Sequence, residues 1–128
     1  MNVVDSSGWL EYFADGPNRG FFSEAVEDVE RLLVPTISIC EVYKIFLRRR
    51  GEQEALRAMG AMRGGQVIDL DFDLALESAK LGAELELPLA DSIILATARR
   101  YNATLWTQDG HFSGLEGVRY IPRVSSGA

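Results

Sequence analysis

The sequence has few of the residues that build disulfides and soft-metal sites. Its 128 residues include one cysteine, Cys40, and one histidine, His111. A single cysteine cannot form an internal disulfide, which favours a cytoplasmic location. No apolar run approaches the roughly 18 residues needed to cross a bilayer. Residues 1–5 also lack the basic region of a signal peptide. We therefore expect a cytoplasmic chain with no membrane partner.

Positive charge is also scarce, since 13 basic residues face 19 acidic ones for a net charge of −6. This balance argues against a protein that holds nucleic acid by bulk charge, but not against an enzyme that holds it through metal ions. The dense basic cluster Arg48, Arg49 and Arg50 suits a helix end, where cations face the carbonyl terminus. Contact with RNA phosphates is the alternative role of these arginines.

The length and composition of the chain are those of one globular domain. Apolar residues make up 47% of it, and a chain of this size can bury a sizeable core. No repeat, low-complexity tract or internal linker interrupts it. We predict a single domain over residues 1–124 and a frayed tail over residues 125–128.

Short β-type runs alternate with longer helical ones along the chain. Strands are predicted at residues 2–5, 32–36, 66–70, 104–107 and 119–121. Helical spacing is found over residues 9–13, and helices are predicted at 21–29, 38–50, 52–62, 72–87 and 91–101. Strands separated by helices imply crossover connections. The pattern predicts an α/β fold with a mainly parallel sheet of four to five strands and helices on both faces.

Four acidic residues fall where such a fold would gather them. Asp5 closes the first strand, and Glu41 lies in the first turn of the helix after the second strand. Asp91 starts a helix after Pro88, and Asp109 follows the fourth strand. Strand ends and helix starts share one edge of a parallel sheet, where ligand sites form. Each acid alone is explained as well by capping or by the helix dipole, but together they predict one site.

Four neighbouring carboxylates repel one another, and a hard cation removes that conflict. Oxygen ligands suit Mg²⁺ or Mn²⁺, whereas zinc prefers His or Cys, which only His111 and Cys40 could supply. A carboxylate-held metal with open water positions suits phosphodiester hydrolysis. Ser6, Ser7 and Thr107 are placed to orient these acids by hydrogen bonds, although simple capping explains Ser6 equally well.

Four sequence blocks resemble the PIN-domain family, and within it the VapC-type toxin ribonucleases of bacterial toxin–antitoxin pairs. The first block is Val3-Val4-Asp5-Ser6-Ser7, and the second is Ser38-Ile39-Cys40-Glu41-Val42. The third runs over residues 89–98 around Asp91, and the fourth over residues 105–112, with Thr107, Asp109 and Phe112 in the pattern Thr-x-Asp-x-x-Phe. The ordered set covers nearly the whole chain, and His111 is not a residue that the last motif requires.

The resemblance implies a three-layer α/β/α sandwich and an endoribonuclease that depends on Mg²⁺ or Mn²⁺. It further implies a homodimer and inhibition by a small cognate antitoxin protein. Two other interpretations remain open: a receiver-like signalling module that binds Mg²⁺, and a PIN-like domain that binds partners without cutting. A receiver-like domain would leave Glu41 without a role and would need a lysine after the last strand, which the sequence lacks.

Several other patterns favour structural roles. The alternating acids at residues 69–73 lack the Gly and Glu that a calcium loop requires, so Asp71 or Asp73 is predicted to cap a helix. A Ser7–His111–acid triad has no supporting nucleophile motif. Trp9 and Trp106 could stack on bases, but their apolar neighbours favour core or dimer packing.

Overall fold

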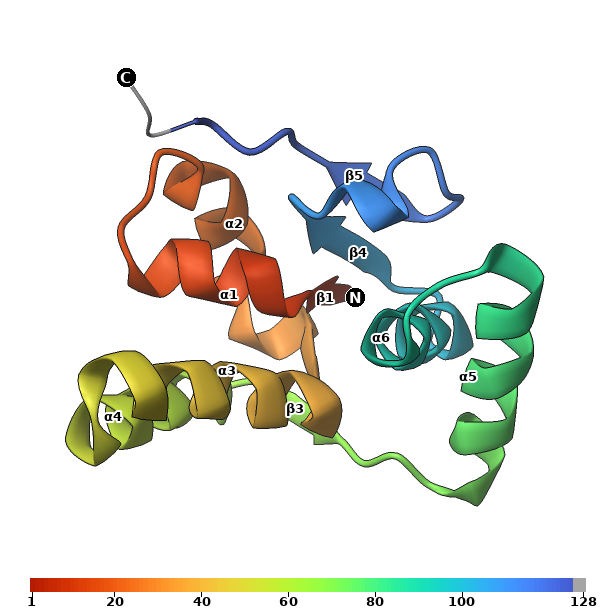
Figure 1. The fold of residues 1–128 in the computed structure, drawn as a ribbon, viewed down its shortest axis with the longest axis horizontal. Coiled ribbons are helices and arrows are strands. Elements are labelled where there is room, and N and C mark those ends of the chain that lie inside the picture. Colours follow the sequence, from red (N-terminus) through yellow and green to blue (C-terminus); the bar gives the residue numbers. More distant parts are fainter. Residues whose placement is uncertain (126–128) are drawn as a thin grey trace.

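The chain folds around one five-stranded sheet whose strands all run parallel (Figure 1). The computed structural model describes residues 1–125. The strands are β1 (Asn2–Val4), β2 (Leu32–Pro35), β3 (Gln66–Ile68), β4 (Thr104–Thr107) and β5 (Val118–Tyr120). Their order across the sheet is β3-β2-β1-β4-β5. The chain therefore builds outward from β1 in one direction, and then returns to build on its other side.

Six helices connect and cover these strands. They are α1 (Ser6–Phe13), α2 (Arg19–Val26), α3 (Thr36–Arg50), α4 (Glu52–Met62), α5 (Phe72–Leu85) and α6 (Leu89–Arg100). Two short 3-10 turns, Val29–Arg31 and Gly110–Phe112, precede β2 and follow β4. Helices α1 to α4 lie to one side of the sheet and α5 and α6 to the other (Figure 1).

Alternating side chains of the central strands fill two separate cores. Val3 of β1 packs with α5 and α6, whereas its neighbour Val4 packs with α1 and α2. Leu105 and Trp106 of β4 divide in the same way. Successive strand residues point to opposite faces, so a fully apolar strand needs a layer of helices on each side. The predicted α/β/α sandwich and parallel sheet are confirmed.

The element boundaries differ from the sequence prediction mainly where a proline or a turn intervenes. Helix α3 begins at Thr36 rather than at residue 38, because Pro35 ends β2 and takes the N-cap position with φ −64° and ψ 139°. Glu41 therefore lies in the second turn of α3, and its predicted place in the first turn is wrong. Helix α5 ends at Leu85 rather than at residue 87, since Glu86 takes a left-handed conformation.

The remaining shifts are small. Helix α2 covers Arg19–Val26 rather than residues 21–29, because Val29 begins the 3-10 turn that precedes β2. Strand β3 stops at Ile68 rather than at residue 70, and β5 starts one residue before its predicted position. Helix α6 starts at Leu89 rather than at Asp91, with Pro88 as its N-cap residue. Asp91 still lies in the first turn of α6.

The ends of the chain and its helix lengths bear on two further predictions. Residues 126–128 of the predicted frayed tail lie outside the described residues, and the single-domain boundary at residue 124 stays a prediction. Within residues 1–125, every helix is too short or too polar to cross a membrane.

Candidate active site

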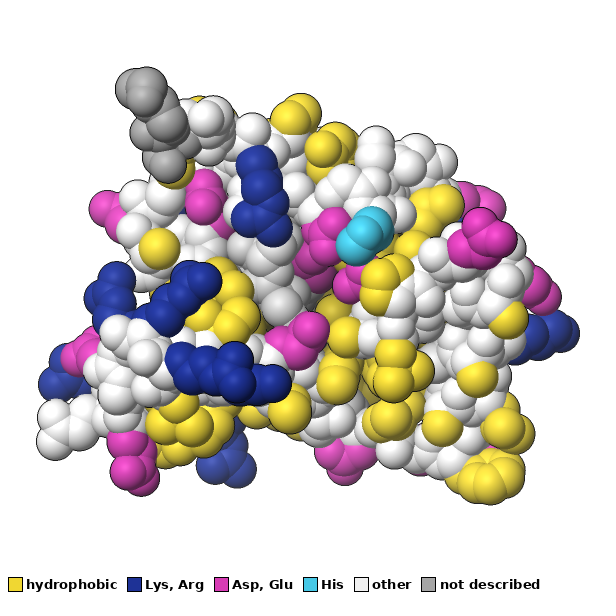
Figure 2. Space-filling view, viewed as in Figure 1, with side chains coloured by type: hydrophobic (Ala, Val, Ile, Leu, Met, Phe, Trp, Pro, Cys, Tyr) yellow, Lys and Arg dark blue, Asp and Glu magenta, His cyan; other side chains and the backbone are white. Residues whose placement is uncertain are grey.

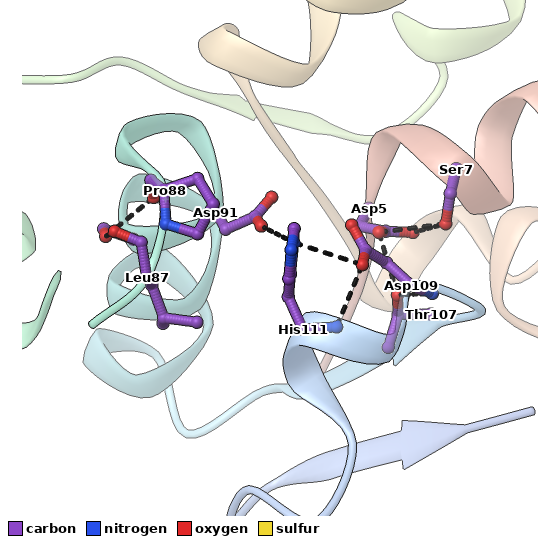
Figure 3. A network of polar contacts seen from close by, with 9 residues as sticks. Asp5, Ser7, Leu87, Pro88, Asp91, Thr107, Asp109 and His111 are labelled. Carbon is purple, nitrogen blue, oxygen red and sulfur yellow. Dashed lines mark hydrogen bonds and ion pairs between the residues drawn. The ribbon is translucent and has the colours of Figure 1, made fainter. Parts of the chain in front are cut away.

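The acidic residues gather at the carboxyl edge of the sheet, where β1 and β4 lie side by side (Figure 3). Asp5 directly follows β1, and Asp109 lies two residues beyond β4. Asp91 comes from the first turn of α6, and Glu41 from α3. Strands β2 and β4 lie on opposite sides of β1, so the chain crosses to one side of β1 after that strand and later to its other side. Such a switch point opens a crevice at the strand ends.

Asp5 is a buried carboxylate held by several donors. It is only 3% exposed. Its Oδ1 accepts the backbone N–H of Gly8 at 3.0 Å and thereby caps α1. The Ser7 hydroxyl donates to Oδ1 at 2.8 Å, and the Thr107 hydroxyl donates to Oδ2 at 2.8 Å. These bonds fix the orientation of the carboxylate that the sequence placed at the end of the first strand.

Burial nevertheless raises the pKa of Asp5 from 3.8 to about 6. The hydrogen bonds from Ser7, Gly8 and Thr107 lower this pKa, and the charge of Asp109 raises it further. Loss of hydration therefore outweighs the donors. An anion at this position lacks a sufficient positive counterpart among the described side chains.

Asp91, Asp109 and His111 form the tightest group of the site. The His111 Nδ1 lies 2.9 Å from Asp91 Oδ2 and 3.3 Å from Asp109 Oδ1. One ligand atom from each of the three lies within 4.8 Å of the others. The contact between His111 and Asp91 joins the turn after β4 to the start of α6 (Figure 3).

The pKa of Asp91 is also raised, mainly by burial and next by the charge of Asp109. The hydrogen bond and charge of His111 lower it, and Glu41 raises it. Asp109 therefore acts electrostatically on both Asp5 and Asp91, and Glu41 acts on Asp91. All four predicted acids share one electrostatic environment, although Asp5 and Glu41 lie outside the group whose atoms are all within 4.8 Å.

Two more hydroxyl contacts connect the edge. The Ser6 hydroxyl donates to Glu41 Oε1 at 2.5 Å, so that α1 orients a carboxylate carried by α3. The Thr107 hydroxyl, besides donating to Asp5, accepts the backbone N–H of Asp109 at 2.8 Å. Ser6, Ser7 and Thr107 therefore make the kind of hydrogen bond predicted for them. Their roles in catalysis stay predictions.

The donor set of this edge fits a hard divalent cation. It offers carboxylate oxygens from separate elements, two of them on groups whose charged form is disfavoured by burial and by like charge. A cation reverses both effects. His111 adds one nitrogen, and Cys40 is exposed on α3. Oxygen-rich sites of this kind suit Mg²⁺ or Mn²⁺ more than a thiolate-seeking metal.

Sequence reasoning did not assign His111 to the site. Its ring contacts Asp91 and Asp109 because the 3-10 turn after β4 folds back, with the His111 backbone N–H donating to Asp109 Oδ1 at 2.9 Å. The signal that could have found it is local: the single histidine of the chain stands two residues after a predicted ligand.

Other candidates take structural roles. Trp9 is fully buried and Trp106 is 4% exposed, so both belong to the core, as their neighbours predicted. Asp71 caps α5 by accepting the Leu74 N–H at 2.8 Å. The hydroxyl of Ser7 donates to Asp5 rather than to His111, so the residues of a hydrolytic triad are not connected.

The chain belongs to the PIN domain family, whose model matches residues 3–118. None of the curated proteins matches the chain significantly. Among solved structures, the chain is similar to a toxin–antitoxin complex from Klebsiella pneumoniae, with 27% identity and a TM-score of 0.77 over 93% of this chain and 96% of that chain.

Two more distant structures show the same fold. VapC20 from Mycobacterium tuberculosis, described as a toxin that cleaves the sarcin–ricin loop, is 20% identical with a TM-score of 0.75, over 92% of this chain and 97% of that one. A DNA-bound VapBC from Salmonella typhimurium is 15% identical with a TM-score of 0.76, over 95% and 97%. Membership of the PIN family excludes the receiver-like interpretation.

Proposed function

We propose that the chain is a metal-dependent endoribonuclease and the toxin of a type II toxin–antitoxin pair. The observation that carries this proposal is the meeting of Asp5, Asp91 and Asp109, with Glu41 beside them, at the switch point of a PIN fold. The similarity to solved toxins, one of which is described as cleaving an RNA loop, supports RNA as the substrate class.

In this proposal Asp5, Glu41, Asp91 and Asp109 hold Mg²⁺ or Mn²⁺. The ion supplies a water of lowered pKa and offsets charge on the phosphate being cleaved. Ser7 and Thr107 orient Asp5, and Ser6 orients Glu41, through the hydrogen bonds described above. Outer hydrogen bonds of this kind commonly change metal affinity or activity by about 10- to 100-fold when removed.

The proposal includes the partners of a toxin. A small cognate antitoxin would neutralise the nuclease, in line with the similarity to toxin–antitoxin complexes. A homodimer and a cytoplasmic location belong to the same proposal. The remaining alternative is a PIN domain that binds metal and partners without cutting RNA.

The test is cleavage of single-stranded RNA by the purified protein with Mg²⁺ or Mn²⁺ and with a chelator. Cleavage is expected with metal and lost with chelator. Asp91→Asn is expected to remove cleavage while leaving the circular dichroism spectrum and melting temperature close to those of the native chain, because asparagine keeps the shape of this partly buried side chain and its oxygen can still pair with His111 Nδ1. Asp73→Asn, an exposed acid in the first turn of α5, is the matched control.

Two outcomes would contradict the proposal in different ways. Cleavage that survives the chelator would remove the metal from the mechanism. Metal binding without cleavage of any RNA tested, in native protein of normal stability, would support the non-catalytic alternative.

A further inference from the structure

A groove of about 440 Å³ leads away from the acidic edge. Ser6 and Ser7 line its near end, and these are the residues whose hydroxyls hold Glu41 and Asp5. Leu10 of α1 and Ile45 of α3 give it apolar walls. Its volume lies within the range of about 300–1,000 Å³ that is usual for ligand sites. The groove therefore adjoins the candidate active site through Ser6 and Ser7, although none of the four acids lines it.

Two arginines line this groove. Arg49 comes from the last turn of α3 and Arg123 from the segment after β5. Within residues 1–125, neither guanidinium forms an ion pair of 4.0 Å or less with a carboxylate. The one acid of the groove, Glu11, accepts the backbone N–H of Asn18 at 2.7 Å. The groove thus carries two arginine cations and the hydrogen-bonded Glu11 carboxylate, and it lies beside the negatively charged acidic edge.

The backbone just before the exposed Arg123 is anchored by a buried amide pair. Asn18 and Gln108 are 6% and 4% exposed. The Asn18 Nδ2 donates to Gln108 Oε1 at 2.9 Å and to the Pro122 carbonyl at 3.0 Å. The Ile121 N–H donates to the Thr107 carbonyl at 3.0 Å. These bonds fix the residues just before Arg123 against the end of β4.

The three arginines at the end of α3 differ in which cavity they line. Arg49 lines both the groove that begins at Ser6 and Ser7 and an adjoining hollow of about 70 Å³ between α1 and α3. Arg50 lines only that hollow, which is too small for a nucleotide. Arg48 lines neither of these two cavities. Figure 2 shows Lys and Arg side chains gathered along one side of the acidic patch and the histidine.

We propose that Arg49 and Arg123 bind backbone phosphates of a single RNA strand that runs through this groove beside the cleaved bond. The inference rests on the proposed nuclease function. Guanidinium groups match phosphate oxygens in a two-pronged geometry. A chain of net charge −6 needs such local cations, because its acids repel RNA on either side of any bound metal.

Binding of RNA tests this proposal apart from cleavage. A fluorescein-labelled single-stranded RNA is titrated with the whole chain in the presence of Ca²⁺, a hard cation that binds oxygen ligands. The integrity of the labelled RNA is checked on a gel. For single strands, each phosphate contact contributes about 0.7 to the slope of log affinity against log salt. Arg49→Gln and Arg123→Gln are each expected to reduce the slope by about 0.7, and to weaken binding by roughly threefold or more at low salt.

The controls separate a groove from general charge. Arg99→Gln is the matched control, because Arg99 lines a groove of about 370 Å³ beside Asn102 and Thr104, where β4 begins rather than ends. It is expected to leave affinity and slope unchanged. Arg49→Lys is expected to keep the slope. Equal losses from Arg48→Gln and Arg49→Gln would overturn the proposal in favour of diffuse charge at the end of α3.

Failure of the groove and failure of the nuclease are distinguishable. Normal cleavage with unchanged binding by both groove variants would refute the arginine sites and leave the nuclease standing. If the native protein cuts no RNA but the groove variants lose RNA binding, the arginine sites stand and the nuclease function is refuted. If the variants keep RNA binding but lose binding of a protein partner, the groove serves that partner instead and this proposal fails.

Discussion

At the scale of single residues, Asp5 shows how one side chain can serve two purposes. Its carboxylate caps α1 through the Gly8 N–H, which is an ordinary structural role. The same carboxylate is turned and held by Ser7 and Thr107 at the mouth of the crevice. The capping role and the role in the candidate site are therefore compatible, because one carboxylate makes both sets of contacts.

Thr107 connects two acids, and its removal is expected to show this. Thr107→Val keeps the shape of a fully buried side chain but removes the donor to Asp5 Oδ2 and the acceptor for the Asp109 N–H. We expect cleavage to fall by about 10- to 100-fold and the free energy of unfolding to fall by about 1–3 kcal/mol. Cleavage rates and denaturant unfolding measure the two effects.

Thr97→Val is the control for that substitution. Thr97 is equally buried, but its hydroxyl donates to the Ile93 carbonyl within α6. We expect normal cleavage from this variant. Equal losses of cleavage in the two variants would show that Thr107 contributes through packing alone.

At the scale of elements, the approach of α5 to α6 sets the position of Asp91. A Cβ atom added at Gly82 of α5 would collide with the side chain of Ser92. Ser92 is the residue after Asp91, and its hydroxyl donates to the Pro88 carbonyl at 2.9 Å. The absence of a side chain on one helix thus allows the first turn of the other to sit where its acid reaches the site.

Gly82→Ala is expected to disturb the site from a distance. Overpacking of this kind costs about 1–3 kcal/mol, and the displaced turn carries Asp91, so both the melting temperature and the cleavage rate should fall. Gly60→Ala is the matched control, since Gly60 lies inside α4 with open space where its Cβ would stand. It should gain about 0.5–1 kcal/mol from higher helix propensity. A Gly82→Ala protein with native stability and activity would contradict this account of the helix contact.

At the scale of the whole molecule, the charged forms of the buried acids at this edge destabilise the folded chain. The raised pKa of Asp5 means that the folded chain holds this proton more tightly than the unfolded chain. The associated stability is present below about pH 4 and is lost as the pH rises through about 6. A rise from 3.8 to about 6 corresponds to about 3 kcal/mol.

This linkage predicts how stability depends on pH and metal. Without metal, Asp5→Asn should gain stability relative to the native chain as the pH rises from about 4 to 6, with no further gain above that range. Since metal binds the deprotonated carboxylates of the folded chain, Mg²⁺ should raise the melting temperature of the native chain more at about pH 7.5 than at about pH 5. Thermal unfolding with Mg²⁺ or chelator measures both effects. A Mg²⁺ effect independent of pH, or equal in Asp5→Asn, would remove Asp5 from the metal site.

Local sequence patterns were enough to predict the alternation of strands and helices and the edge at which the acids meet. Short runs of β-branched, aliphatic and aromatic residues such as residues 104–107 favour a strand, and the bounds of β4 and α4 are as predicted. Strand ends and helix starts must share an edge in any parallel sheet. That rule placed Asp5, Asp91 and Asp109 together with no knowledge of strand order, and placed Glu41 near them despite an error of one helical turn.

The partners that each acid contacts depend instead on how the elements pack in three dimensions. The contact of His111 with Asp91 requires β4 to lie beside β1 and the following turn to fold back over α6. The position of Arg123 requires β5 to pair with β4 and Asn18 to reach Pro122, 104 residues away. Local patterns fix which face of an element is buried, whereas the order of strands is set by the packing of the whole core. The arginine groove and the histidine are therefore properties of the folded chain alone.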